Sequence, residues 1–139
     1  MVAMQFHHYR DRARDFLGGM DLLQDDLDAY RYSSALLGIH GAISYADALR
    51  AGMGSKKLSS EDHSQAVEEL KSLLNSRGFE QQQGIKHLRV LLSRKSRISY
   101  AAATVRKHEV EDIVKRAKRF ADWAEETGKA LKIEGWWDD

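Results

Sequence analysis

A chain of 139 residues, 42% hydrophobic and 31% charged, has the composition of one globular domain, so we treat residues 1–139 as a single domain. It contains no cysteine, which excludes disulfides, thiolate catalysis and thiolate metal sites, and no proline that would force a helix to break. No apolar run approaches the ~18 residues of a membrane-spanning helix, and the N-terminus does not resemble a secretory signal. We therefore expect no membrane association and a cytoplasmic location.

The net charge of +1 hides an uneven distribution of charges. Residues 1–30 hold three arginines against six aspartates, and residues 120–139 hold two lysines against six acids. Between them, residues 77–119 hold twelve lysines and arginines against only four acids. Such a segment predicts a basic face that meets phosphate groups. The alternative is that basic and acidic segments pair with each other inside one bundle.

Apolar residues spaced by three and four positions predict a first helix that ends near residue 23. Its stripe comprises Phe6, Tyr9, Ala13, Phe16, Met20 and Leu23. The aspartates of the following segment, QDDLDA, are good N-caps for a second helix from about Tyr30 to Ala51. Alanine, glycine and serine are frequent in the middle of this helix. Because small residues allow close approach, we expect it to lie at the centre of a bundle.

Three further helices follow along the chain. Ser59, with Asp62 three residues later, predicts a capped start for a third helix, which ends near residues 75–78. The fourth begins near Glu80 and has the apolar residues Ile85, Leu88, Leu91, Leu92 and Ile98. The segment SYAAATV is a soft break in which Thr104 is the candidate N-cap of the fifth helix. The fifth apolar stripe comprises Val110, Ile113, Val114, Ala117, Phe120, Ala121 and Ala124.

These patterns predict an all-α fold, an up-and-down bundle of four to five helices. No strand alternation and no internal repeat interrupts them. The tail, KIEGWWDD, brings two tryptophans. Because an exposed pair of tryptophans would be an adhesive end, we expect Trp136 or Trp137 to dock on the bundle.

Two polar residues interrupt one face of the second helix. His40 and Asp47 share this face with apolar neighbours and lie two turns apart, about 10 Å along the helix. They are too far apart to bond each other, but both can form the polar floor of a binding cleft. Alternatively, His40 bonds a neighbouring backbone group and Asp47 pairs with a cation.

The chain carries no pattern for a metal or cofactor. His7 and His8 are adjacent and terminal, while His63, His87 and His108 fall on separate segments with no carboxylate at ligand spacing, and neither Glu-x-x-His nor His-Glu-x-x-His occurs. Neither a P-loop nor Gly-x-Gly-x-x-Gly is present, and no serine has a paired base. We therefore predict no metal site and no cofactor.

Two stretches resemble the HEPN family of small helical bundles. In YRYSSALLGIHGAISYADALRAG the likeness lies in the Ser-Ser-Ala-Leu-Leu start, in His40 and in the Ala-Asp-Ala-Leu of residues 46–49. The second stretch, HLRVLLSRKSRISYAAATV, is an apolar helix that ends in cations followed by an aromatic residue. The segment VEDIVKRAKRFADWAEE fits the closing helix of the family. This likeness spans roughly residues 9–126 and implies a bundle of four or five helices that commonly dimerises.

In the nuclease members of the HEPN family, an arginine precedes a histidine by four to six residues, and the pairs from both subunits cleave RNA in the dimer cleft. Here the arginine candidates are Arg94 and Arg97, and the position six after Arg94 is Tyr100. No arginine in the chain has a histidine after four to six intervening residues. RNA cleavage needs a general acid or base that titrates near neutral pH, and a phenol has a pKa of about 10. The resemblance therefore implies a non-catalytic or repurposed member.

The cations around Tyr100 have two interpretations. The first is a platform for phosphates and a base, formed by Arg94, Lys95, Arg97, Tyr100, Arg106 and Lys107. In the second, the cations complement the dipole at a helix C-terminus, at ~0.3–1 kcal/mol each, and Tyr100 caps the core. One or two cations satisfy a helix dipole, and here five lie within fourteen residues, which favours the platform.

We therefore expect a HEPN-like homodimer that binds RNA or a nucleotide through a basic cleft at the dimer interface without cleaving it. One alternative is a metal-free, toxin-like ribonuclease with an altered active site, for which Arg94, Tyr100 and His40 are the catalytic candidates. A second alternative is a structural bundle that binds a protein partner, such as an accessory subunit or an antitoxin.

Overall fold

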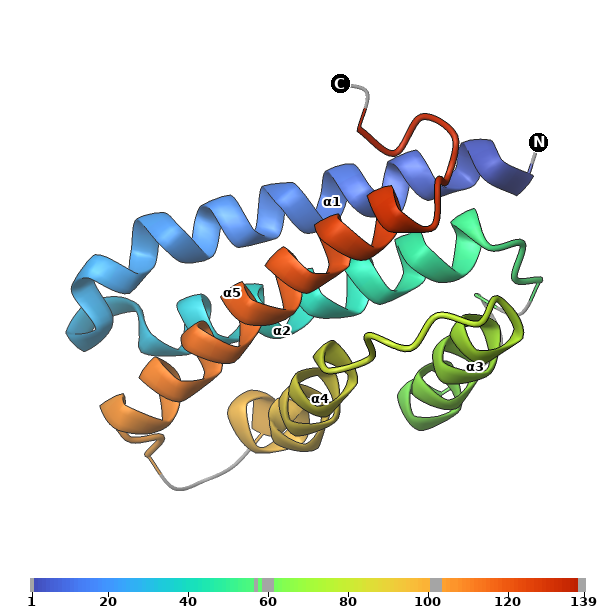
Figure 1. The fold of residues 1–139 in the computed structure, drawn as a ribbon. Coiled ribbons are helices and arrows are strands. Elements are labelled where there is room, and N and C mark those ends of the chain that lie inside the picture. Colours follow the sequence, from blue (N-terminus) through green and yellow to red (C-terminus); the bar gives the residue numbers. More distant parts are fainter. Residues whose placement is uncertain (1, 57, 59–61, 101–103, 138–139) are drawn as a thin grey trace.

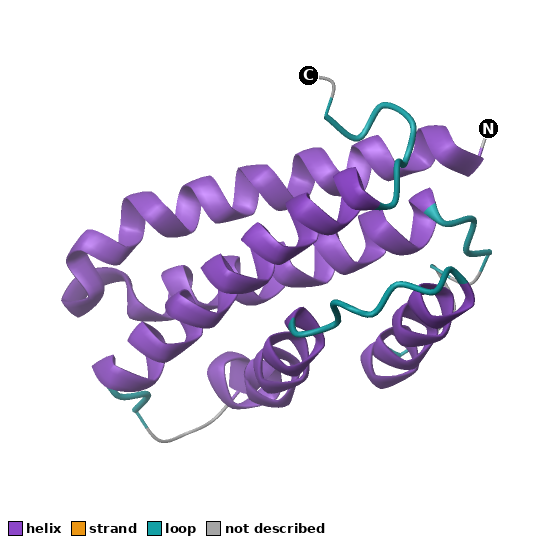
Figure 2. Ribbon diagram, in the orientation of Figure 1, coloured by secondary structure: helices purple, strands orange, loops and turns teal. Residues whose placement is uncertain are grey.

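A computed structural model describes residues 2–56, 58, 62–100 and 104–137 of the chain. It has the α-helices α1 (Val2–Leu23), α2 (Leu27–Gly52), α3 (His63–Ser76), α4 (Gly84–Tyr100) and α5 (Lys107–Ala130). A short 3-10 helix, η1 (Gln24–Asp26), joins α1 to α2. No strand occurs in the described ranges, which confirms the predicted all-α helical bundle (Figure 2). None of the described helices has the length and apolar character needed to cross a membrane.

The long helices α1, α2 and α5 lie side by side, whereas α3 and α4 are seen nearly along their axes and cross them at a steep angle (Figure 1). Helix α2 contacts each of the other four helices, so the predicted central position of the second helix is confirmed. A Cβ atom at Gly38 would meet Met20 of α1 and Ala117 of α5. Another at Gly41 would meet Leu17 of α1. The small residues of α2 therefore set how closely three helices pack.

An aspartate caps the start of α2, as the sequence predicts. Oδ1 of Asp26 accepts a hydrogen bond from the backbone N–H of Ala29 at 3.3 Å. The helix begins at Leu27, a few residues before the predicted start. The backbone of Tyr30 departs from helical values, with φ −124° and ψ 29°, so the predicted start coincides with a kink.

The starts of α3 and α5 differ from their predictions. Asp62 is itself the N-cap of α3 and accepts from the backbone N–H of Gln65 at 2.9 Å. The predicted cap, Ser59, lies outside the described residues. For α5 the prediction of Thr104 is wrong, because Arg106 occupies the N-cap position and makes no side-chain capping bond.

Helix α4 begins four residues later than the sequence predicts, at Gly84 rather than Glu80. Gly78, with a φ of +66°, ends α3 in the left-handed conformation that glycine adopts without strain. The backbone N–H of Phe79 then bonds the carbonyl of Leu74 at 3.0 Å, which closes the end of α3. The following residues form a loop, because the chain must turn before α4 can run back along α3.

The C-terminal segment docks on the bundle through Trp136, which is fully buried. Its ring stacks on Phe6 of α1, with centroids 5.5 Å apart and an angle of 18° between the planes. The buried Arg10 donates from Nη1 to the carbonyls of Gly135 (2.9 Å) and Trp136 (2.6 Å). The prediction that one tryptophan docks is confirmed for Trp136, while Trp137 remains 57% exposed.

The carboxylate of Glu125 joins α5 to α1, α2 and the C-terminal segment. Arg14 donates to it from Nε and Nη2, at 2.8 and 2.9 Å. The Tyr45 hydroxyl donates at 2.7 Å and the Trp136 indole N–H at 3.2 Å. Burial acts to raise the pKa of Glu125, but the hydrogen bonds from Arg14 and Tyr45 outweigh it and hold this pKa below its ordinary value.

The contact between Trp136 and Gly128 yields a prediction for stability. A Cβ atom at Gly128 would collide with the indole of Trp136, whereas one at Gly18 would meet nothing within 4 Å. We expect Gly128→Ala to lower the free energy of unfolding by about 1–3 kcal/mol through overpacking. The matched control, Gly18→Ala, should raise it by about 0.5–1 kcal/mol, since alanine is the better helix former. Urea unfolding of both variants measures the difference, and equal effects would contradict the docking of Trp136.

Candidate functional site

The arginines at the C-terminal end of α4 pair with acids of α5. Arg94 Nη1 lies 3.3 Å from Oδ2 of Asp112. Arg97 donates two hydrogen bonds to Glu109, at 2.9 and 2.8 Å. The hydrogen bond from Arg97 lowers the pKa of Glu109 to about 2. Both acids lie within residues 77–119, so these pairs balance charge inside the basic segment and do not join it to the acidic ends of the chain, and Arg97 remains 43% exposed.

Tyr100, the last residue of α4, is not part of the core. Its side chain is 82% exposed, whereas Ile98, two residues earlier, is buried. The exposure excludes the interpretation in which Tyr100 caps the core. Arg97 lies one turn before Tyr100 on α4, so the two side chains are neighbours on the helix surface.

The connection from α4 to α5 is held against the start of α2. Arg31 donates from Nη1 to the carbonyl of Val105 at 2.9 Å, and the Val105 N–H donates to the Tyr32 hydroxyl at 3.2 Å. These bonds, rather than a side-chain cap, set where α5 begins. They also hold the half-exposed Tyr32 beside this connection.

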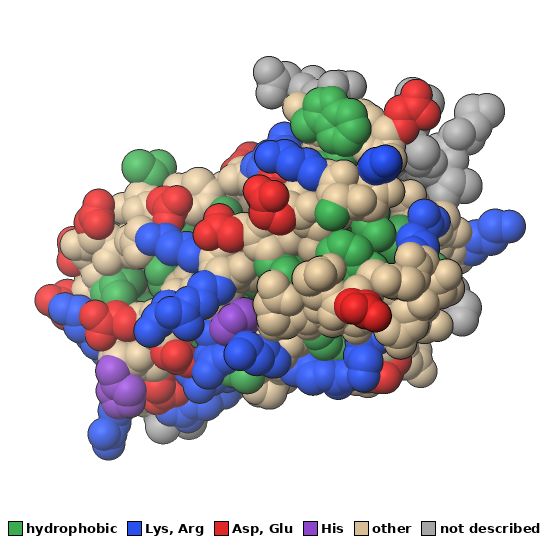
Figure 3. All heavy atoms as spheres, viewed as in Figure 1, with side chains coloured by type: hydrophobic (Ala, Val, Ile, Leu, Met, Phe, Trp, Pro, Cys, Tyr) green, Lys and Arg blue, Asp and Glu red, His purple; other side chains and the backbone are tan. Residues whose placement is uncertain are grey.

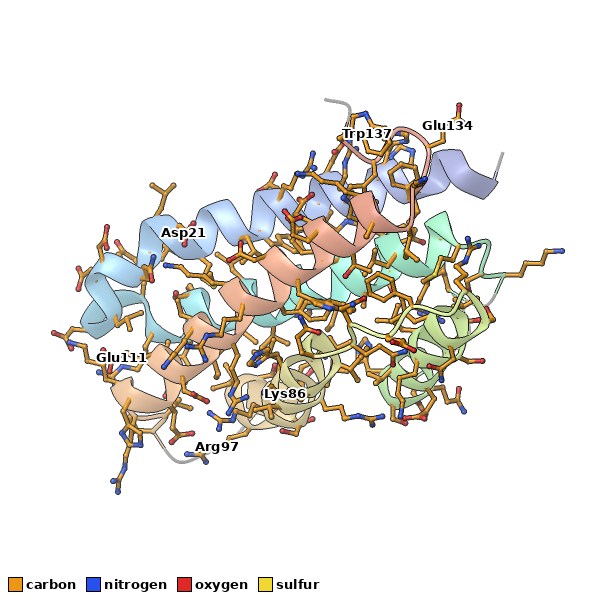
Figure 4. All side chains as sticks on the ribbon, viewed as in Figure 1. Asp21, Lys86, Arg97, Glu111, Glu134 and Trp137 are labelled. Carbon is orange, nitrogen blue, oxygen red and sulfur yellow. The ribbon has the colours of Figure 1, made fainter. Side chains whose placement is uncertain are left out.

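Two exposed cations, Arg106 and Lys107, lie at the start of α5 and form no ion pair with an acid in the described part of the chain. Figure 4 shows Arg97 beside the same connection. We call this region the junction surface, and define it as Tyr32, Arg97, Tyr100, Arg106 and Lys107. It combines exposed aromatic rings with cations.

A second feature is a groove between α3 and α4, with a volume of about 330 Å³. It is lined by His63, Ser64 and Val67 of α3 and by Arg89, Leu92 and Ser93 of α4. We call this feature the α3–α4 groove. His63 also lines a separate, much smaller cavity of about 10 Å³, together with residues of α2 that include Ile43 and Asp47. Of the predicted cleft residues, Asp47 lines the small cavity and not the groove, and His40 lines neither.

His40 is partly buried on α2, and its ring lies edge-on to that of Phe16 of α1, with centroids 6.3 Å apart. Burial lowers the pKa of His40, and the charges of Lys95 and His63 lower it further. Arg94 instead contacts Asp112 on α5. The described contacts therefore do not bring together the catalytic candidates Arg94 and His40.

Asp47 pairs with a cation, as one of its two interpretations expects. Arg50 Nη1 lies 3.1 Å from its Oδ1, and Arg50 is almost completely buried. Burial of the Asp47 carboxyl raises its pKa to about 6, against the opposing effects of Arg50 and Arg12. The carboxyl group therefore changes its charge near the pH range in which histidines titrate.

The sequence did not identify His63 as a groove residue, and our grouping of Lys95 with the surface cations missed that it lies on the apolar stripe of α4. A signal for Lys95 existed, since Leu88, Leu91, Lys95 and Ile98 follow at spacings of three, four and three. This spacing places the lysine on the apolar stripe, whereas we grouped it with the surface cations. His63 had no comparable signal, because its neighbours come from α2 and α4.

No group of three histidine, aspartate or glutamate side chains in the described ranges is arranged to hold a metal ion. No family model, curated protein or solved structure matches this chain. The resemblance to the HEPN family therefore stays a hypothesis, which rests on the two stretches quoted above.

The raised pKa of Asp47 predicts a pH effect on stability. Between pH 7 and 5 the folded protein takes up a proton at Asp47 that the unfolded chain, with a pKa near 3.9, does not bind. Acidification through this range should therefore stabilise the wild type relative to Asp47→Asn, by about 1 kcal/mol. Urea unfolding of both proteins at pH 7 and pH 5 measures this difference, because the histidines contribute equally to each. If the difference in unfolding free energy between the two proteins did not change with pH, this result would contradict a buried Asp47 carboxyl with a raised pKa.

Proposed function

We propose that this protein binds single-stranded RNA at the junction surface and does not cleave it. The observation that carries the proposal is Tyr100, whose ring is 82% exposed at the end of α4, one turn from Arg97. Exposed aromatic rings beside cations are how proteins hold single-stranded bases, because each ring stacks on a base while the cations contact the phosphates. Arg106 and Lys107 supply cations that no described acid neutralises.

The neighbouring surface supports the same proposal through its charge. Lysine and arginine side chains gather over α4 and the N-terminal half of α5 (Figure 3). His87 lies among them. Burial lowers the pKa of His87 most, and the positive charges of Arg116, Lys86 and Arg119 lower it further. Such a face attracts a polyanion over some distance and adds phosphate contacts beside the junction surface.

Two arguments favour binding without cleavage. The nuclease members of the HEPN family have a histidine where this chain has Tyr100, and a phenol does not exchange protons readily at neutral pH. The arginine six residues earlier, Arg94, is engaged with Asp112. The resemblance to the HEPN family and the exposed ring therefore support the same function.

The proposal predicts how RNA affinity depends on Tyr100. We expect Tyr100→Ala to weaken binding of a labelled, mixed-sequence single-stranded RNA by roughly tenfold, since stacking on one base is worth about 1–3 kcal/mol. Tyr100→Phe retains the ring and should bind within about twofold of the wild type. Trp137→Ala is the matched control, because Trp137 is an exposed aromatic residue at the other end of the molecule (Figure 4). Fluorescence anisotropy gives the three affinities.

The cations are tested in the same assay. Replacing Arg106 and Lys107 together by alanine should weaken binding and reduce its salt dependence. Arg97→Ala should have the smaller effect, because Glu109 already neutralises Arg97. The RNA is recovered on a gel after each titration. Unchanged affinity of Tyr100→Ala would refute the platform, and cleavage of the RNA by pure protein would refute the non-catalytic assignment.

We also propose that the protein is a homodimer, as the resemblance implies. Large apolar side chains remain exposed near the turn from α1 to α2, where Leu22 is 80% and Tyr30 48% exposed. A second subunit with two-fold symmetry, the commonest arrangement, can cover such residues. Sedimentation at tens of micromolar should therefore give twice the 15.8 kDa mass of the chain. A monomer at these concentrations would contradict the dimer. RNA would then have to bind to the junction surface of a single chain.

A further inference from the structure

The ion pair between Arg97 and Glu109 differs in geometry from the one between Arg94 and Asp112. Arg97 donates from both Nε and Nη2 to the carboxylate of Glu109, at 2.9 and 2.8 Å. Arg94 approaches Asp112 through Nη1 at 3.3 Å, and the same carboxylate also accepts from Arg116. Glu109 therefore binds Arg97 in the two-pronged geometry with which arginine also binds a phosphate group.

This ion pair is open to a ligand from solvent. The side chain of Arg97 is 43% exposed and that of Glu109 is 20% exposed. Tyr100 follows Arg97 by three residues on α4, a spacing that places the two Cβ atoms about 5–6 Å apart on the helix surface. A nucleotide whose base stacks on the exposed ring of Tyr100 can therefore bring a phosphate to the guanidinium of Arg97.

Glu109 keeps a favourable position when Arg97 leaves it. It lies in the first turn of α5, and the N-terminus of a helix stabilises negative charge. Its backbone N–H also donates to the carbonyl of Arg106 at 3.1 Å, a bond that does not depend on Arg97. Exposed ion pairs contribute little to stability, because water solvates both partners well. Exchange of one anion for another at Arg97 therefore costs little.

We propose that Glu109 is a displaceable counter-ion, which holds Arg97 in the free protein and releases it to a phosphate of the bound single-stranded RNA. This inference rests on the proposed function and names a residue that sets the affinity of the junction surface. The guanidinium keeps two charge-assisted hydrogen bonds throughout, first to the carboxylate and then to phosphate oxygens. The end of α4 thus stays neutral at Arg97 until a ligand supplies a base for Tyr100 and a phosphate for Arg97.

The first test compares two carboxylates at the start of α5. Glu109→Gln should tighten the binding of the labelled single-stranded RNA by roughly two- to fivefold, the strength of an exposed ion pair. Glu111→Gln is the matched control, because Glu111 is an exposed acid at the same end of the molecule as Arg97 and pairs with no cation in the described ranges (Figure 4). Its removal changes only the general field, which salt screens. Equal tightening by the two variants would overturn the proposal.

A double-mutant cycle separates the contact from the general charge. Arg97→Ala should weaken RNA binding roughly two to five times more in the Glu109→Gln background than in the wild type, because no ion pair then offsets the lost phosphate contact. Glu109→Gln should also steepen the plot of log affinity against log salt by about 0.7, the slope for one further phosphate neutralised on a single strand. Additive effects of the two substitutions, with an unchanged slope, would show that Arg97 does not exchange partners.

NMR spectra of ¹⁵N-labelled protein observe the exchange directly. The Nε–Hε resonance of Arg97, identified by its absence from Arg97→Ala, should shift on saturation with RNA. Arg14 is the matched reference, since it donates from Nε and Nη2 to Glu125 at 2.8 and 2.9 Å, and its resonance should not move.

The two proposals fail in different ways. If RNA affinity depends on Tyr100 but the Arg97 resonance does not move, the counter-ion role of Glu109 is wrong and the RNA proposal stands. If neither the wild type nor Glu109→Gln binds RNA, the RNA proposal fails and the counter-ion role fails with it.

Discussion

The carboxylate of Glu125 on α5 is linked by hydrogen bonds to α1, α2 and the C-terminal segment. It accepts hydrogen bonds from Arg14 of α1, Tyr45 of α2 and Trp136 of the C-terminal segment. A partly buried carboxylate is tolerated only when its oxygens are satisfied, so these donors must all be in place. The network thereby holds the three long helices in one arrangement. Helices α3 and α4 cross the layer formed by these long helices. Both contact α2, and α4 also contacts α5.

The two sides of helix α4 have different surroundings. Its side toward α5 carries Arg94 and Arg97, whose charges are balanced by the acids of that helix. Its side toward α2 carries Lys95, which is partly buried and forms no ion pair with an acid in the described ranges. Tyr100 extends beyond the core at the C-terminal end. Part of the positive charge between residues 77 and 119 is therefore balanced by ion pairs with α5, while Arg106 and Lys107 stay exposed without an ion pair to a described acid.

Much of the fold could be predicted from local pattern, and much of the site could not. The apolar stripes and the Asp26 cap depend on neighbouring residues in the chain, so the helices and the start of α2 were accessible. The start of α5 was not, because bonds from α2 to Val105 determine it. Arg94 and Arg97 pair with Asp112 and Glu109, which lie on another helix. These two acids belong to the same basic segment, and no sequence pattern indicated that they would pair with the arginines. His63 lines a cavity together with residues of α2 and α4 that are distant in sequence, so its surroundings could not be predicted locally.

The central claim is that single-stranded RNA contacts the end of α4 and the start of α5. Backbone amide resonances of ¹⁵N-labelled protein, followed during addition of a short single-stranded RNA, test it most directly. The account predicts the largest chemical-shift changes at Tyr100, Arg106 and Lys107, with smaller ones at Tyr32. Amides of α1 and of the C-terminal segment around Trp137 should stay unchanged. Changes confined to those distant segments, or none at Tyr100 when RNA is bound, would contradict the account.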